Sequence, residues 1–297
     1  MRVFGPLLLC FATGLPSVLA SQQSAGSELW RLAAVTLPLP PALASGAAQA
    51  FWNPVQGDGH GQIGLDLLQT PAAVGATGLI GAVRIPVWHF GTVGLVYARM
   101  GIGDLVRTTD SPDPEGELIP FYAQSGGLTW SDTYGSTGVG ATATYHDTRF
   151  DGTRAERWSL DVGVTQQIGD RARVALATRG FSRFANDPAQ DISLGAEYRV
   201  WRGILWGTTP GRLVGRYGLE FGHPGGVDHE LGAGLDIGTP VSLDVVLTRE
   251  ASYGNIAWRG AAGLRVSVGR YRVSFARDGG VSDLGSTFRV GLEASLQ

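Results

Sequence analysis

The five histidines are the side chains of this sequence best suited to acid–base chemistry or metal binding. They are His60, His89, His146, His223 and His229. None has the spacing to another histidine or to a carboxylate that metal-binding patterns require. His146 and Asp147 could form a hydrolase triad with a distant serine, but no Gly-x-Ser-x-Gly turn presents that serine. We therefore expect no enzyme and no metal ion, and we interpret the histidines as ordinary solvated side chains.

Lysine and phosphate chemistry are not supported either. All 23 basic residues are arginine, so the chain has neither a Schiff-base lysine nor a P-loop lysine. The Gly-x-Gly sequences that begin at Gly101, Gly138 and Gly232 have no following helix, so they are not phosphate-binding loops. Inward-facing glycines more simply allow curvature and leave room for a plug inside a barrel. We expect no cofactor.

One acidic stretch could bind a cation. Asp110, Asp113, Glu115 and Glu117 lie close together in a segment that also contains proline. Carboxylate oxygens are the ligands that Ca²⁺ prefers. We nevertheless interpret this stretch as a mobile acidic loop.

The composition narrows the class of protein. The chain has 297 residues, of which 16% are charged, and its net charge is −3. Its mean hydropathy is +0.06, and no stretch after the N-terminal 20 residues approaches the ~20 apolar residues of a spanning helix. There is no basic block, so we expect no nucleic acid as a partner.

Apolar and polar residues alternate along most of the chain, most clearly from Trp158 onward. Leu160 and Val162 would lie on one face of a strand and Asp161 on the other. We count about fourteen such segments. They are roughly 62–69, 76–87, 91–100, 119–131, 137–148, 156–168, 172–183, 191–202, 211–222, 229–237, 241–250, 256–268, 270–277 and 285–296. Most have about ten residues, the length of a tilted strand that crosses a bilayer.

The connections between these segments alternate in length. Every second one is short, as at 88–90 and 169–171, and the others are longer, as at 101–118 and 184–190. Outer-membrane barrels have short periplasmic turns and long external loops, with both termini inside. The stretch 203–210 breaks this alternation, because it is a longer connection in a position that should be short.

The sequence therefore predicts an all-β fold, a transmembrane antiparallel β-barrel of about fourteen strands. Apolar side chains would face lipid, and charged side chains would line the lumen and pair across neighbouring strands. The predicted luminal charges are Arg179, Glu197, Arg199, Arg216, Glu220, Asp236, Arg259 and Arg265. A soluble β-sandwich would produce the same alternation, since its two sheets cover each other. The length of the segments favours the barrel.

Aromatic residues lie at or near the ends of many segments, where interfacial girdles form in membrane barrels. They are Trp88, Phe90, Trp130, Trp158, Trp201, Trp206, Trp258 and Tyr271.

The N-terminus carries export signals. Residues 1–20 have a basic start at Arg2, an apolar centre and a small-residue cleavage site before Ser21, as in a signal peptide. The only cysteine, Cys10, lies in this segment, so the mature chain would have no disulfide. We predict a signal peptide at 1–20, a luminal or hatch segment at 21–60 and the barrel at 61–297. Export without disulfides fits a bacterial envelope protein in the outer membrane.

A short stretch before the first strand carries a family resemblance. Residues 44–54, Ala-Ser-Gly-Ala-Ala-Gln-Ala-Phe-Trp-Asn-Pro, resemble the FadL-like superfamily of outer-membrane long-chain fatty-acid transporters, and in particular its PorV/PorQ-type branch. In that branch a small-residue stretch leads into a Trp-Asn-Pro-Ala-Gly turn before the barrel. Trp52, Asn53 and Pro54 match this motif, whereas Val55 and Gln56 depart from it.

The resemblance implies that the segment ending at Pro54 folds into the lumen as a plug or hatch. It also implies either transport of fatty acids and other hydrophobic compounds or a partner role in protein secretion. We expect outer-membrane lipid as the surroundings, and transport of a hydrophobic small molecule as the function. The alternative is a barrel that does not transport and docks secretion-system or surface-attachment proteins. A soluble periplasmic lipid-binding protein is the third hypothesis.

Overall fold

The computed structural model describes most of the chain. The described residues are 29–34, 36–55, 61–69, 75–107, 118–180, 191–221, 226–238, 240–251, 256–279 and 286–296. The predicted signal peptide, the acidic loop at 110–117, His60 and His223 lie outside these ranges.

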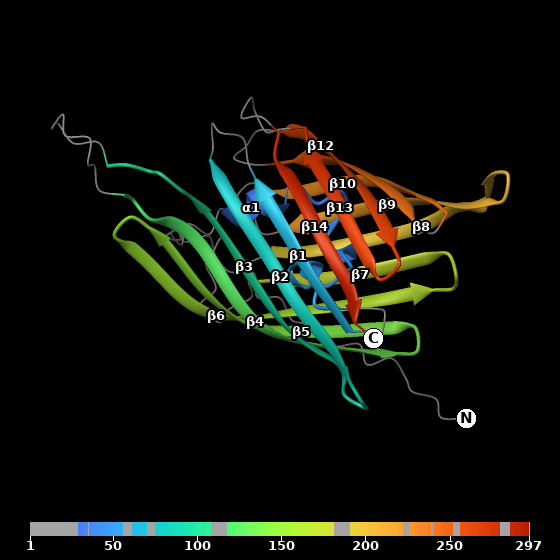
Figure 1. The fold of residues 1–297 in the computed structure, drawn as a ribbon, viewed down its shortest axis with the longest axis horizontal. Coiled ribbons are helices and arrows are strands. Elements are labelled where there is room, and N and C mark those ends of the chain that lie inside the picture. Colours follow the sequence, from blue (N-terminus) through green and yellow to red (C-terminus); the bar gives the residue numbers. More distant parts are fainter. Residues whose placement is uncertain are drawn as a thin grey trace.

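The described chain forms a closed barrel of antiparallel strands in sequence order, β1 to β14 (Figure 1). The strands are β1 (Gly61–Gln69), β2 (Ala76–Val87), β3 (Gly91–Ile102), β4 (Phe121–Tyr134), β5 (Thr137–Phe150), β6 (Thr153–Ile168), β7 (Ala172–Arg179), β8 (Asp191–Trp206), β9 (Thr209–Phe221), β10 (Val227–Ile237), β11 (Val241–Glu250), β12 (Ala257–Val268), β13 (Tyr271–Asp278) and β14 (Phe288–Leu296). The last strand pairs with the first, from Gly61 opposite Leu296 to Gln69 opposite Phe288. Closure leaves no unpaired sheet edge, as a sheet in lipid requires.

The outside of the barrel is apolar and the inside is polar or small. On β1, Ile63, Leu65 and Leu67 are exposed, whereas Gln62 and Asp66 are buried. The same inversion recurs around the wall, where leucine, valine and aromatic side chains dominate the exposed set. A continuous belt of exposed apolar side chains around a barrel is typical of a surface that faces lipid. The predicted transmembrane barrel is confirmed, and the soluble sandwich is wrong because the apolar faces do not meet one another.

The two ends of the barrel differ. At the turn end, which contains the C-terminal end of β14, short connections such as 88–90 and 135–136 join consecutive strands. The opposite end, the loop end, has the longest connections, such as 103–120 and 180–190. The connection between β5 and β6 is an exception at the loop end, because it consists of Asp151 and Gly152 alone and is shorter than predicted.

The stretch 203–210 is not a long connection. Strands β8 and β9 continue through it to a turn at Gly207 and Thr208. Register shifts occur between Arg199 and Trp201 and again between Ile204 and Trp206. Bulges of this kind interrupt the two-residue alternation on which the sequence interpretation depended. The resulting hairpin projects beyond its neighbours at the turn end (Figure 1).

Aromatic side chains lie outside at both ends. Trp88, Phe90 and Trp206 are exposed near the turn end, and Trp158 and Trp258 are exposed nearer the loop end. Trp130 and Tyr271 also lie near the turn end, and the Trp130 indole N–H donates to the Phe90 carbonyl at 2.7 Å. Trp201 instead lies over Gly203 and Gly211 of the projecting hairpin. Two bands of amphipathic rings around a hydrocarbon belt are typical of membrane barrels.

The N-terminal segment contains helix α1 (Leu29–Ala34) and two single turns, η1 (Pro41–Leu43) and η2 (Ala48–Phe51). Figure 1 shows these blue elements within the ring of strands. Prolines at positions 38, 40 and 41 prevent α1 from continuing into η1 as one longer helix.

Candidate functional site

The N-terminal segment fills the lumen. Its described residues, 29–34 and 36–55, are called the plug below. The side chains of Ala42, Leu43 and Asn53 are almost inaccessible, at 0%, 1% and 1% exposure. Ser45 is the exposed exception among the described plug side chains. The barrel therefore has a packed core inside its wall, formed by its own chain.

Inward-facing glycines of the wall make room for the plug. The glycine seats, as we call them, are Gly64, Gly138, Gly140, Gly163, Gly195, Gly218 and Gly263. At each seat an added Cβ would lie between 2.4 and 2.8 Å from a plug atom. Contacts this short would force the plug or the wall to move. The expectation that inward glycines leave room for a plug is met at Gly138 and Gly140.

The predicted hatch motif closes the plug on itself. Asn53 donates from Nδ2 to the Ala42 carbonyl at 2.5 Å, and its Oδ1 accepts from the Val55 N–H at 2.9 Å. The backbone of Pro54 lies against Gly140. A short amide side chain suits this position, because it satisfies a buried donor and a buried acceptor together. The motif thus has a structural role in the lumen.

Arg179 of β7 joins the wall to the motif. Its guanidinium carbon lies 4.8 Å from the Trp52 ring centre and 5.6 Å from that of Phe51. The same guanidinium forms a buried ion pair with Asp191 of β8. Cation–π attraction is strongest when both groups are removed from water, as they are here. The predicted luminal Arg179 therefore holds the plug as well as a neighbouring strand.

One side of the lumen is hydrophobic. The apolar wall comprises inward side chains of β1 to β4, namely Leu68, Ala76, Ile80, Ala82, Val96, Ala98, Met100 and Ala123. Leu29, Trp30 and Ala33 of α1 belong to the same buried cluster. The Trp30 and Phe51 rings lie 4.8 Å apart, which connects α1 to the hatch motif. Burial of apolar surface is therefore what holds α1 in place.

The opposite side of the lumen, from β7 to β14, carries ion pairs and is called the charged wall. Arg216 donates to Glu197 at 2.8 Å and to Asp244 at 2.5 Å. Arg265 reaches the other oxygen of Asp244 at 3.4 Å. Arg173 donates to the Leu43 carbonyl of the plug at 3.1 Å. The network links β8, β9, β11 and β12, and Arg173 of β7 joins the wall to the plug.

Other predicted charges are paired locally. Arg259 donates to Glu250 at 2.9 Å near the loop end, and Arg212 donates to Asp236 at 2.7 Å near the turn end. The second pair is half-exposed, so it adds little stability.

Arg199 extends toward the exposed turn after β6. It donates to Asp170 at 2.5 Å. This hydrogen bond and the charge of Arg199 hold the pKa of Asp170 below its ordinary value. Arg199 therefore forms its ion pair at the turn end of the barrel.

Glu220 forms no ion pair with the residues that the structure describes, contrary to what the sequence suggested. It faces Asp228 directly across the β9–β10 pair, and both side chains are buried. Asp228 in turn accepts from the Ala251 N–H at 2.7 Å. Two carboxylates opposite each other repel when both are ionised. The prediction differed from the structure because the partner of Glu220 depends on how β9 pairs with β10. The sequence alone does not give this register.

The histidine and aspartate of the possible triad lie on opposite faces of β5. His146 points inward, and its Nε2 lies 2.7 Å from the Ser159 hydroxyl. Asp147 pairs with Arg154 at 2.8 Å instead. The carboxylate beside Ser159 is Asp161, which also accepts from the Gly180 N–H at 2.6 Å. His146 and Asp147 therefore do not share a site.

The other described histidines lie apart from the lumen. His89 occupies the turn after β2 with a φ of 64°. His229 lies 2.7 Å from the Tyr217 hydroxyl on the outer face. Within the described ranges no group of three or more metal-ligating side chains is arranged to hold a metal ion. No helix in these ranges has the length and hydropathy to cross a bilayer.

The sequence interpretation missed two luminal groups. Asp66 lies between Leu65 and Leu67, so the alternation on β1 already placed it inside. The apolar wall had no such signal, because β2 and β3 carry apolar residues on both faces, as at Leu79 and Ile80. Alternation cannot assign a face when both parities are apolar.

No family model matches the chain, and no curated protein matches it. Among solved structures, the chain is similar to outer membrane protein Omp33 of Acinetobacter baumannii, with 8% identity over 80% of this chain and 98% of that chain and a TM-score of 0.46. It is also similar to CdiB from Acinetobacter baumannii, with 9% identity over 80% and 60% of the two chains and a TM-score of 0.45.

A triple-mutant porin of Rhodopseudomonas blastica has 10% identity over 80% of this chain and 99% of that chain, with a TM-score of 0.38. All three TM-scores are low, so nothing about function is carried over from these proteins.

Proposed function

We propose that the chain is a bacterial outer-membrane barrel that its own plug closes, and that it serves as a membrane-embedded anchor or docking unit. The observation that carries this proposal is the seating of the plug. Seven glycines of the wall accept it at distances that leave no room for a side chain. A barrel built around an occupied lumen does not need to conduct.

The charged wall supports the same proposal. Arg216 is bonded to two carboxylates on different strands, and Arg173 is bonded to the plug itself. Charge-assisted pairs that cross the lumen lining oppose both water passage and plug release. The antiparallel barrel, its short turns beside the C-terminal end of β14 and its aromatic bands support an outer-membrane location.

A second candidate function is passage of hydrophobic small molecules. The apolar wall favours it, because Ile80, Met100 and Ala98 form a buried surface to which such molecules would bind. This surface is covered by the plug elements α1 and η2, so passage requires the plug to move. The resemblance of residues 44–54 to FadL-like proteins points the same way. The two functions therefore differ in whether the plug leaves its seats.

A reversible disulfide between the plug and the wall distinguishes the anchor function from the transport function. The Leu43 side chain lies 2.6 Å from where a Cβ would lie on Gly195. The double variant Leu43→Cys, Gly195→Cys in a Cys10→Ser background can thus form one disulfide across this seat. Liposomes carrying oxidised or reduced protein are assayed for conductance and for uptake of a lipophilic fluorophore. The variant Leu43→Cys alone is the control.

An anchor predicts no conductance and no uptake in either redox state, and a stable stoichiometric partner in detergent extracts of native membranes. Uptake that stops on oxidation and returns on reduction would instead establish transport through plug movement. Absence of a stable partner, together with such uptake, would overturn the anchor proposal.

A further inference from the structure

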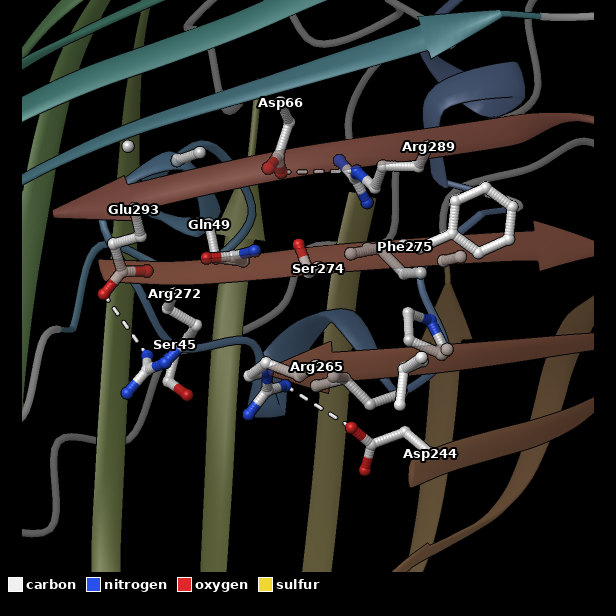
Figure 2. Close-up of a pocket in the computed structure, with 18 of the residues that line it drawn as sticks. Ser45, Gln49, Asp66, Asp244, Arg265, Arg272, Ser274, Phe275, Arg289 and Glu293 are labelled. Carbon is white, nitrogen blue, oxygen red and sulfur yellow. Dashed lines mark hydrogen bonds and ion pairs between the residues drawn. The ribbon is translucent and has the colours of Figure 1, made fainter. Parts of the chain in front are cut away.

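A cavity lined by both charged and apolar side chains lies between the plug and the charged wall (Figure 2). Its volume is about 50 Å³. Plug residues Ser45 and Gln49 line one side, and strands β1 and β11 to β14 line the other. This volume holds a few water-sized groups, so it excludes a lipid or a sugar. Figure 2 shows Arg265, Arg272 and Arg289 reaching the cavity from three different strands.

Arg289 is the unusual member of the lining. Its residue exposure is 3%, and its Nε, Nη1 and Nη2 all lack a hydrogen-bond partner among the described residues. Asp66 lies 3.3 Å from Nε, which is an ion pair without a formed hydrogen bond. A buried guanidinium normally uses its five N–H donors, because unmet donors are costly away from water. The two terminal nitrogens form a fork suited to an anion.

The neighbouring arginines hold their carboxylates loosely. Arg272 lies 3.2 Å from Glu293, and Arg265 lies 3.4 Å from Asp244. Arginines elsewhere in the barrel are closer to theirs, at 2.5 Å for the Arg216–Asp244 pair and 2.9 Å for the Arg259–Glu250 pair. Charge-assisted hydrogen bonds are ordinarily about 2.7–2.9 Å long. All three arginines of the cavity therefore have donor capacity that their carboxylates do not use.

Gly291 leaves room for the Asp66 and Ser274 side chains, which line the cavity. It pairs with Asp66 of β1 on one side and with Ser274 of β13 on the other. An added Cβ would meet Asp66 Oδ1 and Ser274 Oγ at 2.3 Å each. Asp66 and Ser274 therefore lie on either side of Gly291, and both line the cavity beside Arg289 (Figure 2).

We infer that this cavity binds a small inorganic anion, of the size of chloride or phosphate, and that the anion fastens the plug to the charged wall. The Arg289 fork supplies the main contact, and Arg265 and Arg272 supply the remaining positive charge. The Ser274 hydroxyl and the Gln49 amide are neutral donors on opposite sides. Asp66, Asp244 and Glu293 also line the cavity and oppose the anion, and Asp66 does so most directly because its carboxylate shares the Arg289 guanidinium. The site is the same whether the barrel docks proteins or transports molecules.

The opposed roles of Asp66 and Arg289 provide the test. The purified full-length protein in zwitterionic detergent is titrated with sodium phosphate and with sodium chloride at constant ionic strength, balanced with gluconate, which is too large for the cavity. Binding is followed by ³¹P line broadening for phosphate, and by the thermal midpoint of heat-modifiable gel migration for both anions. Wild type should show saturable binding and a rising midpoint.

Asp66→Asn should bind the anion several-fold more tightly, because the competing carboxylate is gone. The double variant Asp66→Asn, Arg289→Gln removes both charges together, and it should lose at least tenfold in affinity. Arg259→Gln, which changes a luminal arginine away from the cavity, is the matched control and should bind as wild type does.

If the double variant does not fold, Ser274→Ala provides the second measurement and should weaken binding several-fold. Absence of saturable binding in wild type would overturn the inference. An equal response in wild type and in the double variant would also overturn it, since this result means an adventitious ion only.

Discussion

The apolar wall and the charged wall of the lumen hold the same plug by different kinds of interaction. The apolar wall of β1 to β4 buries Leu29, Trp30 and Ala33 among aliphatic side chains. The charged wall of β7 to β14 meets the plug with three of the seven glycine seats, Gly195, Gly218 and Gly263, and with polar groups such as Arg173. Hydrophobic contact is non-directional and supplies stability. Glycine seats and directed hydrogen bonds instead define where each plug residue lies.

This difference shows how a small segment is oriented inside a wide pore. A plug held only by apolar contacts could slide, since such contacts tolerate repacking. A plug held only by ion pairs would gain little, because desolvation offsets the attraction. The plug contacts both walls: Trp52 lies against Arg179 of the charged wall, and its neighbour Phe51 lies against Trp30, which is buried with the apolar wall. The following changes test how independent the two walls are.

The largest effect is expected in the charged wall, at Arg216. Arg216→Leu leaves Glu197 and Asp244 without their shortest partner in a buried setting. We expect a loss of about 3–5 kcal/mol in the free energy of unfolding. Urea unfolding in detergent, followed by gel migration, measures it. Arg212→Leu removes a half-exposed pair and should cost less than about 1 kcal/mol; similar losses in both would contradict a buried network.

The apolar wall is tested at Ile80, whose exposure is 1%. Ile80→Ala leaves a cavity beside the plug and should cost about 2–4 kcal/mol by the same unfolding measurement. Leu95→Ala changes an exposed, lipid-facing side chain, and it should cost distinctly less. An equal cost for the two variants would mean that the wall does not pack on a fixed plug.

The glycine seats are tested at Gly140, where a Cβ would lie 2.6 Å from the Pro54 carbonyl oxygen. Gly140→Ala should destabilise the protein by about 1–3 kcal/mol through overpacking, and it should increase protease access to the plug. A Cβ added at Gly126 would have none of the described residues beyond its chain neighbours within 4 Å, so Gly126→Ala is the matched control. Unchanged protease access in Gly140→Ala would argue against tight seating.

The smallest effect should have the opposite sign. Glu220 faces Asp228 across β9 and β10, so Glu220→Gln removes a like-charge contact and should stabilise the barrel by about 0.2–1 kcal/mol at neutral pH. Glu197→Gln weakens the bond to Arg216 and should destabilise it. Thermal midpoints of the two variants compare them directly, and a lower midpoint for Glu220→Gln would show that its charge is compensated.

Much of the fold could be predicted from the sequence. The strand segments agree closely with the structure, as at 76–87, 241–250 and 191–202 against Asp191–Trp206. Alternation is a local property, and in lipid it has one consistent meaning on every strand. The error at 203–210 arose where bulges break that alternation.

The site was only partly predictable. The charges on strands were placed inside by their parity, and Arg179, Arg216 and Arg265 lie there. Their partners depend on strand register, so the Glu220–Asp228 opposition and the shared Asp244 could not be foreseen. The glycine seats were expected only in general terms, since contact with a plug depends on its path through the lumen.

By itself, the sequence determined that the strands exist, that they number about fourteen and that their apolar faces point outward. Side-chain alternation is encoded residue by residue. Only the tertiary structure decided which carboxylate each arginine meets, which glycines hold the plug and where the small cavity lies. These depend on contacts between residues far apart in the chain, which closure of the barrel and the path of the plug bring together.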